Sequence, residues 1–422
     1  MTPTHTSVAV TGLGAITPLG LSVSAFWDAA LRGESGAAPI TRFDPAAFET
    51  RFAAELKGFD PHNYMERKLA RRLDPFAQFA VAAAREAIAD AGFASDTMSD
   101  AARARIGVIV GSGQGGMQTF QAQAEVFRAS GPGRMSPFFV PMLIPNMAGS
   151  VIAMEHGLRG PNHCVVSACA TGNDNLMSAL DTIRSGRADI VVTGGSEACI
   201  TELGLGGFAA ARALSTRNES PSTASRPFDT DRDGFVIGEG AAVLVLESWE
   251  SAIARGAHVY AALLGVGASN DAYHMTAPHP EGMGAILSMR AALAEAGVDA
   301  TDVDSINMHA TSTALGDAAE CAAVRAVFGA HADRLTATAT KSMTGHMLGA
   351  AGAAEAVLTV LSIVHGVVPP TINLDNMDPA CCVGVARNAA VSRPVGVALS
   401  NSFGFGGHNT SAVFAAAGAH GA

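Results

Sequence analysis

The chain has 422 residues, well beyond the ~150 residues of a typical single core, so we expect two core halves or one large α/β domain. Hydrophobic residues make up 48% and charged residues 15%, which fits a deeply buried core and a sizeable subunit interface. The formal net charge of −11 argues against nucleic acid as the main partner.

Membrane insertion, secretion and metal binding are also disfavoured. A spanning helix needs roughly 20 apolar residues, whereas the longest candidate, 356–368, contains Thr359, Ser362 and His365, and we read it as a buried core helix. No basic region precedes an apolar stretch at the N-terminus, so we expect no signal peptide. The six cysteines show no metal-ligand spacing. We therefore expect a cytoplasmic protein with reduced thiols and no bound metal.

Apolar runs and helical periodicities alternate along the chain, which predicts an α/β fold. The helix at 75–91 is well marked, because Asp74 can cap it, Pro75 suits its first position and Gly92 can end it. The expected strands are 7–11, 106–110, 163–168, 189–193, 241–247, 258–268, 304–309, 335–339 and 395–400. The expected helices are 23–32, 75–91, 139–156, 170–185, 283–296, 315–328 and 347–366.

Two Gly-rich turns, after the strands at 106–110 and 395–400, echo each other and are compatible with a duplicated core. Such a core would divide near residue 255 into halves 1–255 and 256–422. The first turn, 111–116, matches G-x-G-x-x-G, but the stretch about 20 residues on, 129–135, is neither a strand nor acidic. We therefore do not expect a nicotinamide cofactor.

The candidate nucleophile is Cys169, between the expected strand 163–168 and the helix 170–185. A thiol on the first turn of a helix has its pKa lowered by the helix dipole, and the thiolate is the reactive form. The small residues beside it leave room for a bulky thioester. Free cysteines are more often inert core residues, and we read Cys164, Cys199 and Cys321 in that way.

Two histidines lie at element junctions, where ligands bind in α/β sheets. His309 ends the strand 304–309, and the helix that follows carries Asp317 and Glu320 near its start. His346 closes the segment 340–346 (Thr-Lys-Ser-Met-Thr-Gly-His). The stretch 229–240, between Cys169 and His309 in the chain, begins like a calcium loop but carries Gly240 at its twelfth position, so we interpret it as a charged turn near the site.

These groups suit carbon–carbon bond formation. A thiolate can accept an acyl group and leave again, and two neutral imidazoles can donate N–H groups to an enolate oxygen. Backbone N–H groups of the Gly-rich turn 403–407 can form a second oxyanion hole. Lys341 is expected to organise the site, because its amine would need burial to titrate near neutrality.

Several motifs resemble those of the β-ketoacyl-[acyl-carrier-protein] synthases, closest to the type II elongating enzymes. The motifs are 167–172 (Ser-Ala-Cys-Ala-Thr-Gly), 307–317, 340–346, 400–407 (Ser-Asn-Ser-Phe-Gly-Phe-Gly-Gly), 226–235, 270–276 and 136–141. The similarity spans roughly residues 5–415. It implies a thiolase-like layered αβαβα fold with two pseudo-symmetric halves, working as a dimer on acyl carrier protein without a cofactor.

The resemblance also implies a role for each matching position. Cys169 would carry the acyl group, His309 and His346 would promote decarboxylation, and Phe405 would complete the oxyanion hole and gate malonyl entry. Lys341 would pair with Glu355, and Asp317 would support the site. The acyl or phosphopantetheine channel would be lined by Gln114, Phe208, Thr276, Thr311, Thr313 and Phe403. The acidic carrier protein would meet Arg67, Lys68, Arg71, Arg72 and Arg212, although a basic cluster is more often simply solvated.

The chain departs from the family pattern at three places: Gln114 in place of an aliphatic residue, the pair Asn173-Asp174, and Ala310 after the histidine. The first two leave open a ketosynthase subunit of a type II polyketide or polyene synthase that acts with a chain-length-factor partner. A thiolase would carry a second cysteine within 400–408, and a non-catalytic subunit would lack Cys169, so both readings are disfavoured.

Overall fold

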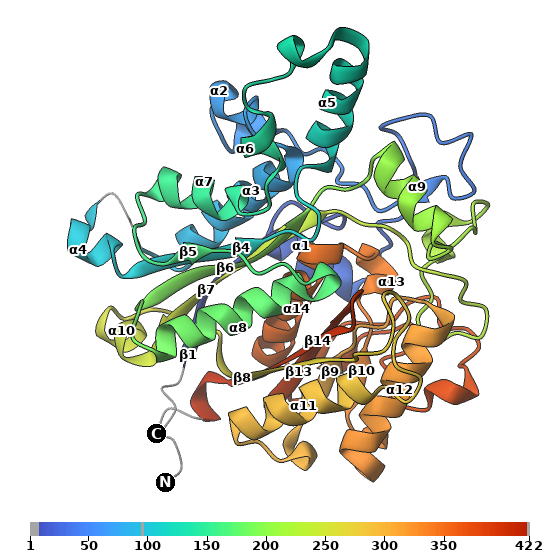
Figure 1. Cartoon of the computed structure of the whole chain (residues 1–422). Helices are drawn as coiled ribbons and strands as arrows, with labels where there is room; N and C mark the ends of the chain where they lie inside the picture. The colour runs from blue at the N-terminus through green and yellow to red at the C-terminus, as the bar shows by residue number, and fades with distance from the viewer. Residues whose placement is uncertain (1–7, 94–96, 420–422) are drawn as a thin grey trace.

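A ten-stranded mixed sheet runs through the computed structural model, which describes residues 8–93 and 97–419 (Figure 1). The strand order is β10-β9-β13-β14-β8-β1-β7-β6-β4-β5. The first half supplies β1 (Val8–Ile16), β4 (Ile106–Gly111), β5 (Asn162–His163), β6 (Ile190–Glu197) and β7 (Gly240–Ser248). The second half supplies β8 (Ala261–Asn270), β9 (Ser305–Asn307), β10 (Thr336–Thr338), β13 (Val397–Gly404) and β14 (His408–Ala416).

The two halves of the sheet repeat one topology. In the first, β4 is parallel to β5 and β6, β6 is antiparallel to β7, and β7 is antiparallel to β1. In the second, β9 is parallel to β10 and β13, β13 is antiparallel to β14, and β14 is antiparallel to β8. The halves meet where β1 pairs with β8 over three residues. The expected pair of similar halves is therefore present.

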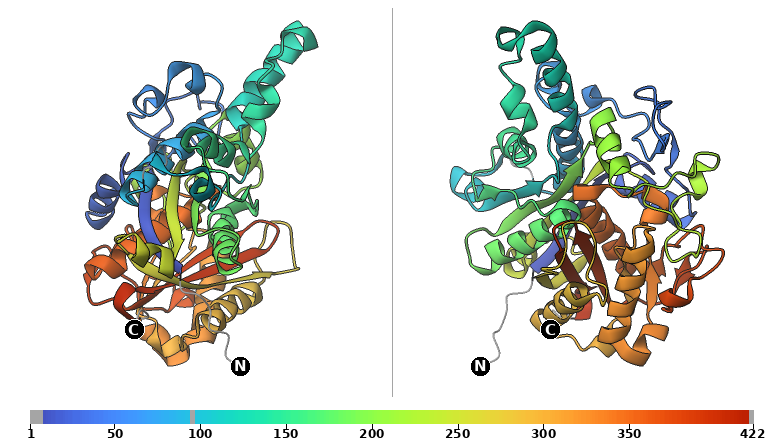
Figure 2. Two further views of the ribbon diagram at one scale, coloured as in Figure 1. Left: turned by 90° about the vertical axis from the view of Figure 1, so that its left-hand side faces the viewer. Right: turned by 45° about the vertical axis from the view of Figure 1, so that its right-hand side comes forward.

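Helices form three layers around the two half-sheets (Figures 1 and 2). The middle layer is α8 (Thr171–Arg184) and α14 (Ala351–His365), whose apolar residues join β1, β7 and β8 in one core. Outside the first half lie α3 (Pro75–Asp90) and α7 (Met147–His156). Outside the second lie α11 (Met283–Ala296) and α12 (Ala314–Phe328). The expected αβαβα layering is confirmed.

The remaining helices and short strands lie at the surface or between layers. They are α1 (Val23–Leu31), α2 (Arg67–Ala70), α4 (Asp100–Arg103), α5 (Met117–Ser130), α6 (Phe139–Leu143), α9 (Glu202–Ala210), α10 (Trp249–Ala254), α13 (Lys341–Thr344), β2 (Ala38–Pro39), β3 (Phe52–Ala53), β11 (Val367–Val368) and β12 (Val391–Ser392). Together, α5 and α6 project from one end of the molecule (Figures 1 and 2).

Two expectations on helices are confirmed by their contacts. The Asp74 carboxylate accepts a hydrogen bond from the N–H of Phe76 at the start of α3, and Gly92 follows the last turn with φ +70°. The stretch Leu348–His365 is long and apolar enough to cross a membrane by length and composition, but 89% of it is buried inside the protein. Its helix, α14, is the expected core helix.

The structure corrects two expected elements. The strand predicted at 163–168 ends at His163, because the N–H groups of Val165 and Ser167 are taken by the side chains of Asn175 and Thr171 instead of a neighbouring strand. The helix predicted at 139–156 breaks into α6 and α7 around Pro145, since the residue before a proline is disfavoured in a helix. The helices α5 and α9 and the strand β14 were not predicted from the sequence. Ser7, the first residue of the expected strand 7–11, lies outside the described residues.

Candidate active site

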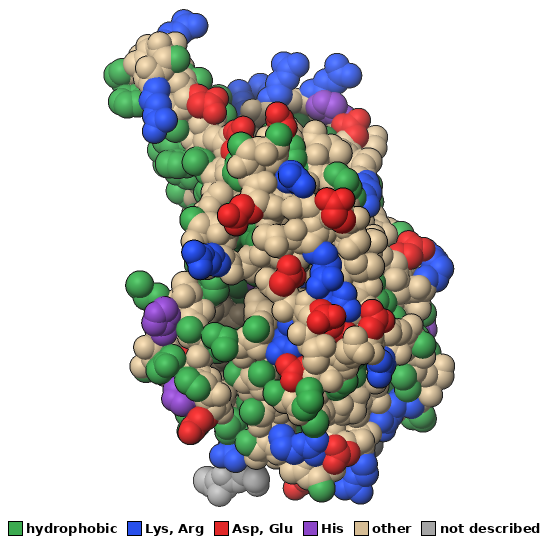
Figure 3. All heavy atoms as spheres, turned by 90° about the vertical axis from the view of Figure 1, so that its right-hand side faces the viewer, with side chains coloured by type: hydrophobic (Ala, Val, Ile, Leu, Met, Phe, Trp, Pro, Cys, Tyr) green, Lys and Arg blue, Asp and Glu red, His purple; other side chains and the backbone are tan. Residues whose placement is uncertain are grey.

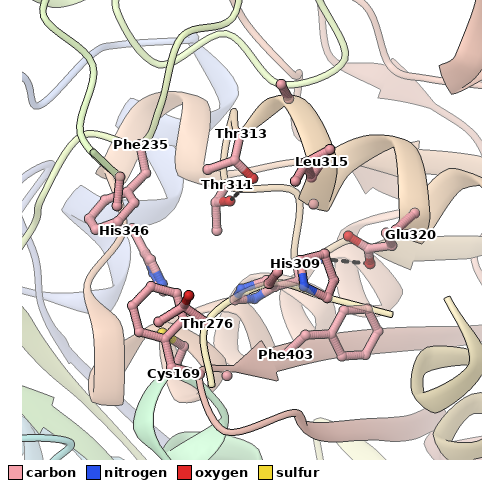
Figure 4. Close-up of a pocket in the computed structure, with 18 of the residues that line it drawn as sticks. Cys169, Phe235, Thr276, His309, Thr311, Thr313, Leu315, Glu320, His346 and Phe403 are labelled. Atoms are coloured by element: carbon pink, nitrogen blue, oxygen red, sulfur yellow. Dashed lines mark hydrogen bonds between the residues drawn. The ribbon is translucent and has the colours of Figure 1, made fainter. Parts of the chain in front are cut away.

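A cavity of about 430 Å³ lies beside α12, where residues from both halves of the chain converge. Figure 4 shows Cys169, His309 and His346 facing this space, with Phe235, Thr276 and Phe403 around them. The predicted residues on its wall are Cys169, Phe208, Arg212, Thr276, His309, Thr311, Thr313, His346, Phe403 and Phe405. One pocket therefore unites the predicted nucleophile with both predicted imidazoles.

Cys169 lies in η4 (Ala168–Ala170), a 3₁₀ turn that leads directly into α8. The preceding Ala168 has φ +52°, a left-handed conformation that a residue with a side chain rarely adopts. Gly404 packs closely against this turn, since a Cβ on it would lie 3.1 Å from the Cys169 nitrogen and 2.6 Å from the Ser167 carbonyl oxygen. The nucleophile turn is thus held against the end of β13, next to Phe405.

The electrostatics of Cys169 differ from the expectation. Burial raises the pKa of its thiol to about 12, opposed by the charge of Lys341 and by the backbone N–H groups of Phe405 and of Cys169 itself. The predicted lowering of the pKa by the helix is therefore wrong for the free protein, because desolvation of the thiolate outweighs the nearby dipoles. The same two N–H groups point at the sulfur and can receive the oxygen of a thioester carbonyl attached there.

This environment predicts slow alkylation of Cys169 in the free protein. Since the raised pKa keeps Cys169 protonated, its rate of reaction with iodoacetamide should keep rising above pH 8.5, where a free cysteine begins to level off. Mass spectrometry of the Cys169 peptide across a pH series measures this rate. A plateau below pH 8 would show that the thiol is activated in the free protein and would contradict the expectation.

The two histidines stand edge to face across the cavity, with ring centroids 5.3 Å apart. The Glu320 carboxylate holds the turn of His309, accepting the backbone N–H of His309 at 2.9 Å and that of Ala310 at 2.7 Å. The ring of His309 packs against Phe403 at 5.7 Å, and that of His346 against Phe235 at 5.3 Å. Both imidazoles are therefore fixed by their backbone and by aromatic neighbours.

Burial and the charge of Lys341 hold the pKa of both imidazoles well below the usual range, so both rings are neutral near pH 7. His346 Nδ1 accepts the backbone N–H of Leu348 at 3.3 Å, which leaves the ring proton on Nε2. The site thus holds neutral N–H donors, as the proposed chemistry needs.

Lys341 lies behind the cavity wall, where it forms a buried ion pair with Glu355, the partner that we expected. Burial raises the pKa of Glu355 to about 7, opposed by Lys341. The lysine still affects the cavity, since its charge acts on the thiol and on both imidazoles. Its place supports an organising role.

The other predicted residues divide into those near the cavity and those outside it. The hydroxyls of Thr311 and Thr313 lie 3.1 Å apart on the wall, and Asp317 accepts the N–H groups of Ser312 and Thr313 just behind them. Arg212, assigned to the docking patch, lies on the cavity wall. Gln114, assigned to the acyl channel, is half-buried and is not among the residues that line the cavity. Arg67, Lys68, Arg71 and Arg72 are exposed on and directly after α2.

Sequence reasoning left two carboxylates without a role. Glu320 anchors the His309 turn from eleven residues away, a link that no periodicity reveals. Glu197, at the end of β6, contacts the turns on both sides of the nucleophile. The sequence feature that could have pointed to Glu197 is a charged residue at the end of an apolar strand. Within residues 8–93 and 97–419, no cluster of histidine, cysteine or acidic side chains is arranged to hold a metal ion.

Comparison with known proteins agrees with this geometry. The family models described as beta-ketoacyl synthase, N-terminal domain and C-terminal domain, match residues 5–252 and 260–375. The chain belongs to the beta-ketoacyl synthase family.

Relatives extend the match over nearly the full chain. This synthase is 47% identical to "3-oxoacyl-[acyl-carrier-protein] synthase 2" of Staphylococcus aureus (strain N315), over 96% of this chain and 97% of that one. Among solved structures it resembles the ishigamide ketosynthase/chain length factor, with a TM-score of 0.90 and 37% identity over 98% and 99% of the two chains. It also resembles a type II polyketide ketosynthase complex, AntDE:AntF, with a TM-score of 0.88 and 34% identity over 98% and 99%.

Proposed function

We propose that this synthase transfers an acyl group from acyl carrier protein to Cys169 and condenses it with malonyl carrier protein, lengthening the chain by two carbons. The observation that carries the proposal is the single cavity shared by a thiol and two neutral imidazoles. The 3-oxoacyl-[acyl-carrier-protein] synthase 2 of Staphylococcus aureus, at 47% identity, supports the same reaction. No cofactor is needed, because the thiol and the donors supply each step.

In the first half-reaction, the Cys169 sulfur attacks the acyl thioester carbonyl and the carrier thiol leaves with the proton that Cys169 gives up. The N–H groups of Cys169 and Phe405 receive the negative charge on the carbonyl oxygen. Because the free thiol is protonated, its proton must leave as the sulfur attacks, and the nearby Lys341 charge lowers the cost of the transient thiolate.

In the second half-reaction, the malonyl thioester loses carbon dioxide and its carbonyl oxygen gains charge as an enolate forms. The N–H groups of His309 and His346 stabilise that oxygen. The enolate carbon then attacks the acyl carbon on Cys169, and the thiolate leaves. Neutral rings suit this step, since a charged imidazolium would be costly in so buried a cavity.

Lys341, Glu355 and Asp317 are proposed to order these groups from behind the wall. Thr311 and Thr313 would contact the phosphopantetheine arm through their hydroxyls. The remaining channel residues are Phe208, Thr276 and Phe403, with Phe405 as a gate. The partly exposed ring of Phe405 lies 6.5 Å from that of Phe208, at the edge of the cavity.

Acyl carrier protein is proposed to dock on the basic residues of α2. Lys and Arg side chains gather at the top of the molecule in Figure 3, the end that carries α2 and α5. Arg72 also stacks over the Phe138 ring at 4.6 Å, which holds its charge at the surface. The carrier arm would then reach the cavity past Arg212.

Charge reversal tests this docking surface. The double variant Arg67→Glu/Arg71→Glu should raise the KM for carrier-bound substrate about tenfold, because electrostatic attraction becomes repulsion. The kinetics with a pantetheine thioester should stay unchanged. Arg187→Glu, on the exposed loop between α8 and β6, is the matched control and should leave both values unaltered. Equal effects of the two variants would place the carrier elsewhere.

A dimer is proposed through the projecting α5–α6 arm. Phe120, Phe127, Phe138 and Val140 are exposed there, and an apolar patch of this kind marks a protein interface. A homodimer is the first candidate. Two similar structures are a ketosynthase/chain length factor and a type II acyl-carrier protein in complex with its ketosynthase, so a heterodimer is the alternative.

A polyketide or polyene pathway remains a second candidate function, favoured by Gln114 and by Asn173-Asp174. In the structure Asn173 donates to the Ser400 carbonyl oxygen and Asp174 pairs with Thr410, so both tie α8 to the second half. We propose that the halves divide near residue 255, between β7 and β8. We also propose that the enzyme acts in the cytoplasm, where soluble carrier proteins are loaded with acyl groups.

Reconstitution tests the function directly. Purified chain, hexanoyl carrier protein and malonyl carrier protein should yield 3-oxooctanoyl carrier protein, detected by mass spectrometry of the carrier. A polyene acyl carrier substrate, run beside it, separates the two pathways. Absence of condensation with both substrates, while the chain is folded and dimeric, would overturn the proposal.

A further inference from the structure

Glu197, the last residue of β6, is a buried carboxylate that the reaction as proposed does not use. It accepts four hydrogen bonds: from Ser112 Oγ at 2.8 Å and from the backbone N–H groups of Gly113 at 2.9 Å, Gln114 at 3.2 Å and Gly349 at 3.0 Å. Within the described parts of the chain, no basic side chain forms an ion pair with it. Burial raises the pKa of this carboxyl to about 7, opposed by the N–H and O–H dipoles of two separate turns.

The two turns meet at the carboxylate with no spare room. A Cβ on Gly349 would lie 2.4 Å from the Gly113 nitrogen and 2.9 Å from Glu197 Oε2, and a Cβ on Gly113 would lie 2.7 Å from that same oxygen. Gly113 also approaches the nucleophile turn, since its Cβ would be 3.4 Å from the Ala168 carbonyl oxygen. Glu197 therefore joins the loop after β4 to the turn after His346, directly behind Cys169.

The turn after His346 is conformationally strained. It is η8 (Leu348–Ala350), and its first residue, Leu348, has φ +48°, which disfavours any residue with a Cβ. In this conformation the Leu348 N–H donates to His346 Nδ1 at 3.3 Å, while the next N–H, that of Gly349, donates to Glu197. The carboxylate thus supports the residue pair that sets the tautomer of the imidazole.

We propose that Glu197 is a positioning residue that holds the strained Leu348–Gly349 turn, and thereby keeps His346 in the tautomer that carries its proton on Nε2. This role of Glu197 depends on the proposed function only for the decarboxylation step, in which His346 donates to the enolate oxygen. A loosened turn would free Nδ1 to take the proton, so the ring would present a lone pair where the enolate needs a donor. Glu197 would then act on decarboxylation through His346 without touching substrate.

The hydrogen bonds make a graded variant series possible. Glu197→Gln keeps one carbonyl oxygen, which can face Gly113 and Gly349, and its amide group can donate to Ser112, so only the Gln114 bond is lost. Glu197→Ala removes all four. We expect Glu197→Gln to stay within about threefold of the parent and Glu197→Ala to lower kcat for malonyl decarboxylation about tenfold, with KM unchanged.

A spectroscopic measurement tests the tautomer itself. In protein labelled with ¹⁵N-histidine, the His346 resonances, assigned with His346→Gln, should show Nε2 protonated in the parent and in Glu197→Gln. Glu197→Ala should show a mixture of tautomers. This readout needs no turnover, so it can fail or succeed independently of the condensation assay.

A second substitution keeps the test open if Glu197→Ala is unstable. Leu348→Gly removes the strain at φ +48°, since glycine adopts left-handed conformations freely. In the double variant Glu197→Ala/Leu348→Gly, the second substitution should restore much of the lost decarboxylation rate and the Nε2 tautomer. The effects of the two substitutions on the rate will therefore not be additive.

Asp74→Asn is the matched control. Asp74 is a buried carboxylate with a raised pKa that accepts from Thr119 in the first turn of α5, and its loss should lower Tm without altering His346. A folded Glu197→Ala protein with His346 fully protonated on Nε2 and decarboxylation within twofold of the parent would overturn the proposal. Additive effects of Leu348→Gly would do so as well.

Discussion

Cys169→Ala should lower acyl transfer from hexanoyl carrier protein to the enzyme by more than about a thousandfold, since no other group in the cavity can form the thioester. The side chain is small and buried, and its loss leaves the turn geometry set by Gly404 and Thr171 in place. The measurement is the intact mass of the enzyme after incubation with the acyl donor. The parent should gain one acyl group and the variant none.

Cys199→Ala is the control for this result. Cys199 is buried in the same apolar cluster as Cys169, and burial likewise raises the pKa of its thiol well above the usual value. Its removal should leave the acyl mass shift intact. Acylation of the Cys169→Ala protein at another residue, at a rate close to the parent's, would reject Cys169 as the acyl carrier.

The reactive groups could be predicted from the sequence because thiol and imidazole side chains keep their reactivity in any secondary structure. Cys169 and His309 each follow a short apolar run, whereas His346 closes the polar segment 340–346. The structure brings all three to one cavity. The local structure was less predictable. Residues 164–167 look like a strand but pair with side chains of α8, a contact that depends on the tertiary fold.

The electrostatics of the site could not be obtained from sequence for a related reason. A helix start predicts a lowered thiol pKa, yet the three-dimensional burial of Cys169 reverses the sign. Glu320 and Glu197 were missed as anchors because their partners are backbone N–H groups, which every residue has and no motif marks. Gln114 was placed in the channel by resemblance, and the cavity of the single chain does not reach it.

His309→Ala and His346→Ala should separate the two half-reactions. Each removes one N–H donor to the enolate oxygen, and loss of one such donor typically lowers the rate about 10²- to 10³-fold. Acyl loading on Cys169 should persist, because its oxyanion hole is made by the N–H groups of Cys169 and Phe405. Release of labelled carbon dioxide from malonyl carrier protein and the acyl mass shift measure the two steps separately.

His346→Gln provides the sharper comparison. Its amide can present an N–H near the position of Nε2, so decarboxylation should recover part of the loss, whereas His346→Leu, of similar bulk, should not. Both rings are already neutral near pH 7. The decarboxylation rate of the parent should therefore show no change from imidazole titration between pH 6.5 and 8. Loss of acyl loading together with decarboxylation in every histidine variant would instead mean that the imidazoles act as bases for Cys169, and the donor role would have to be abandoned.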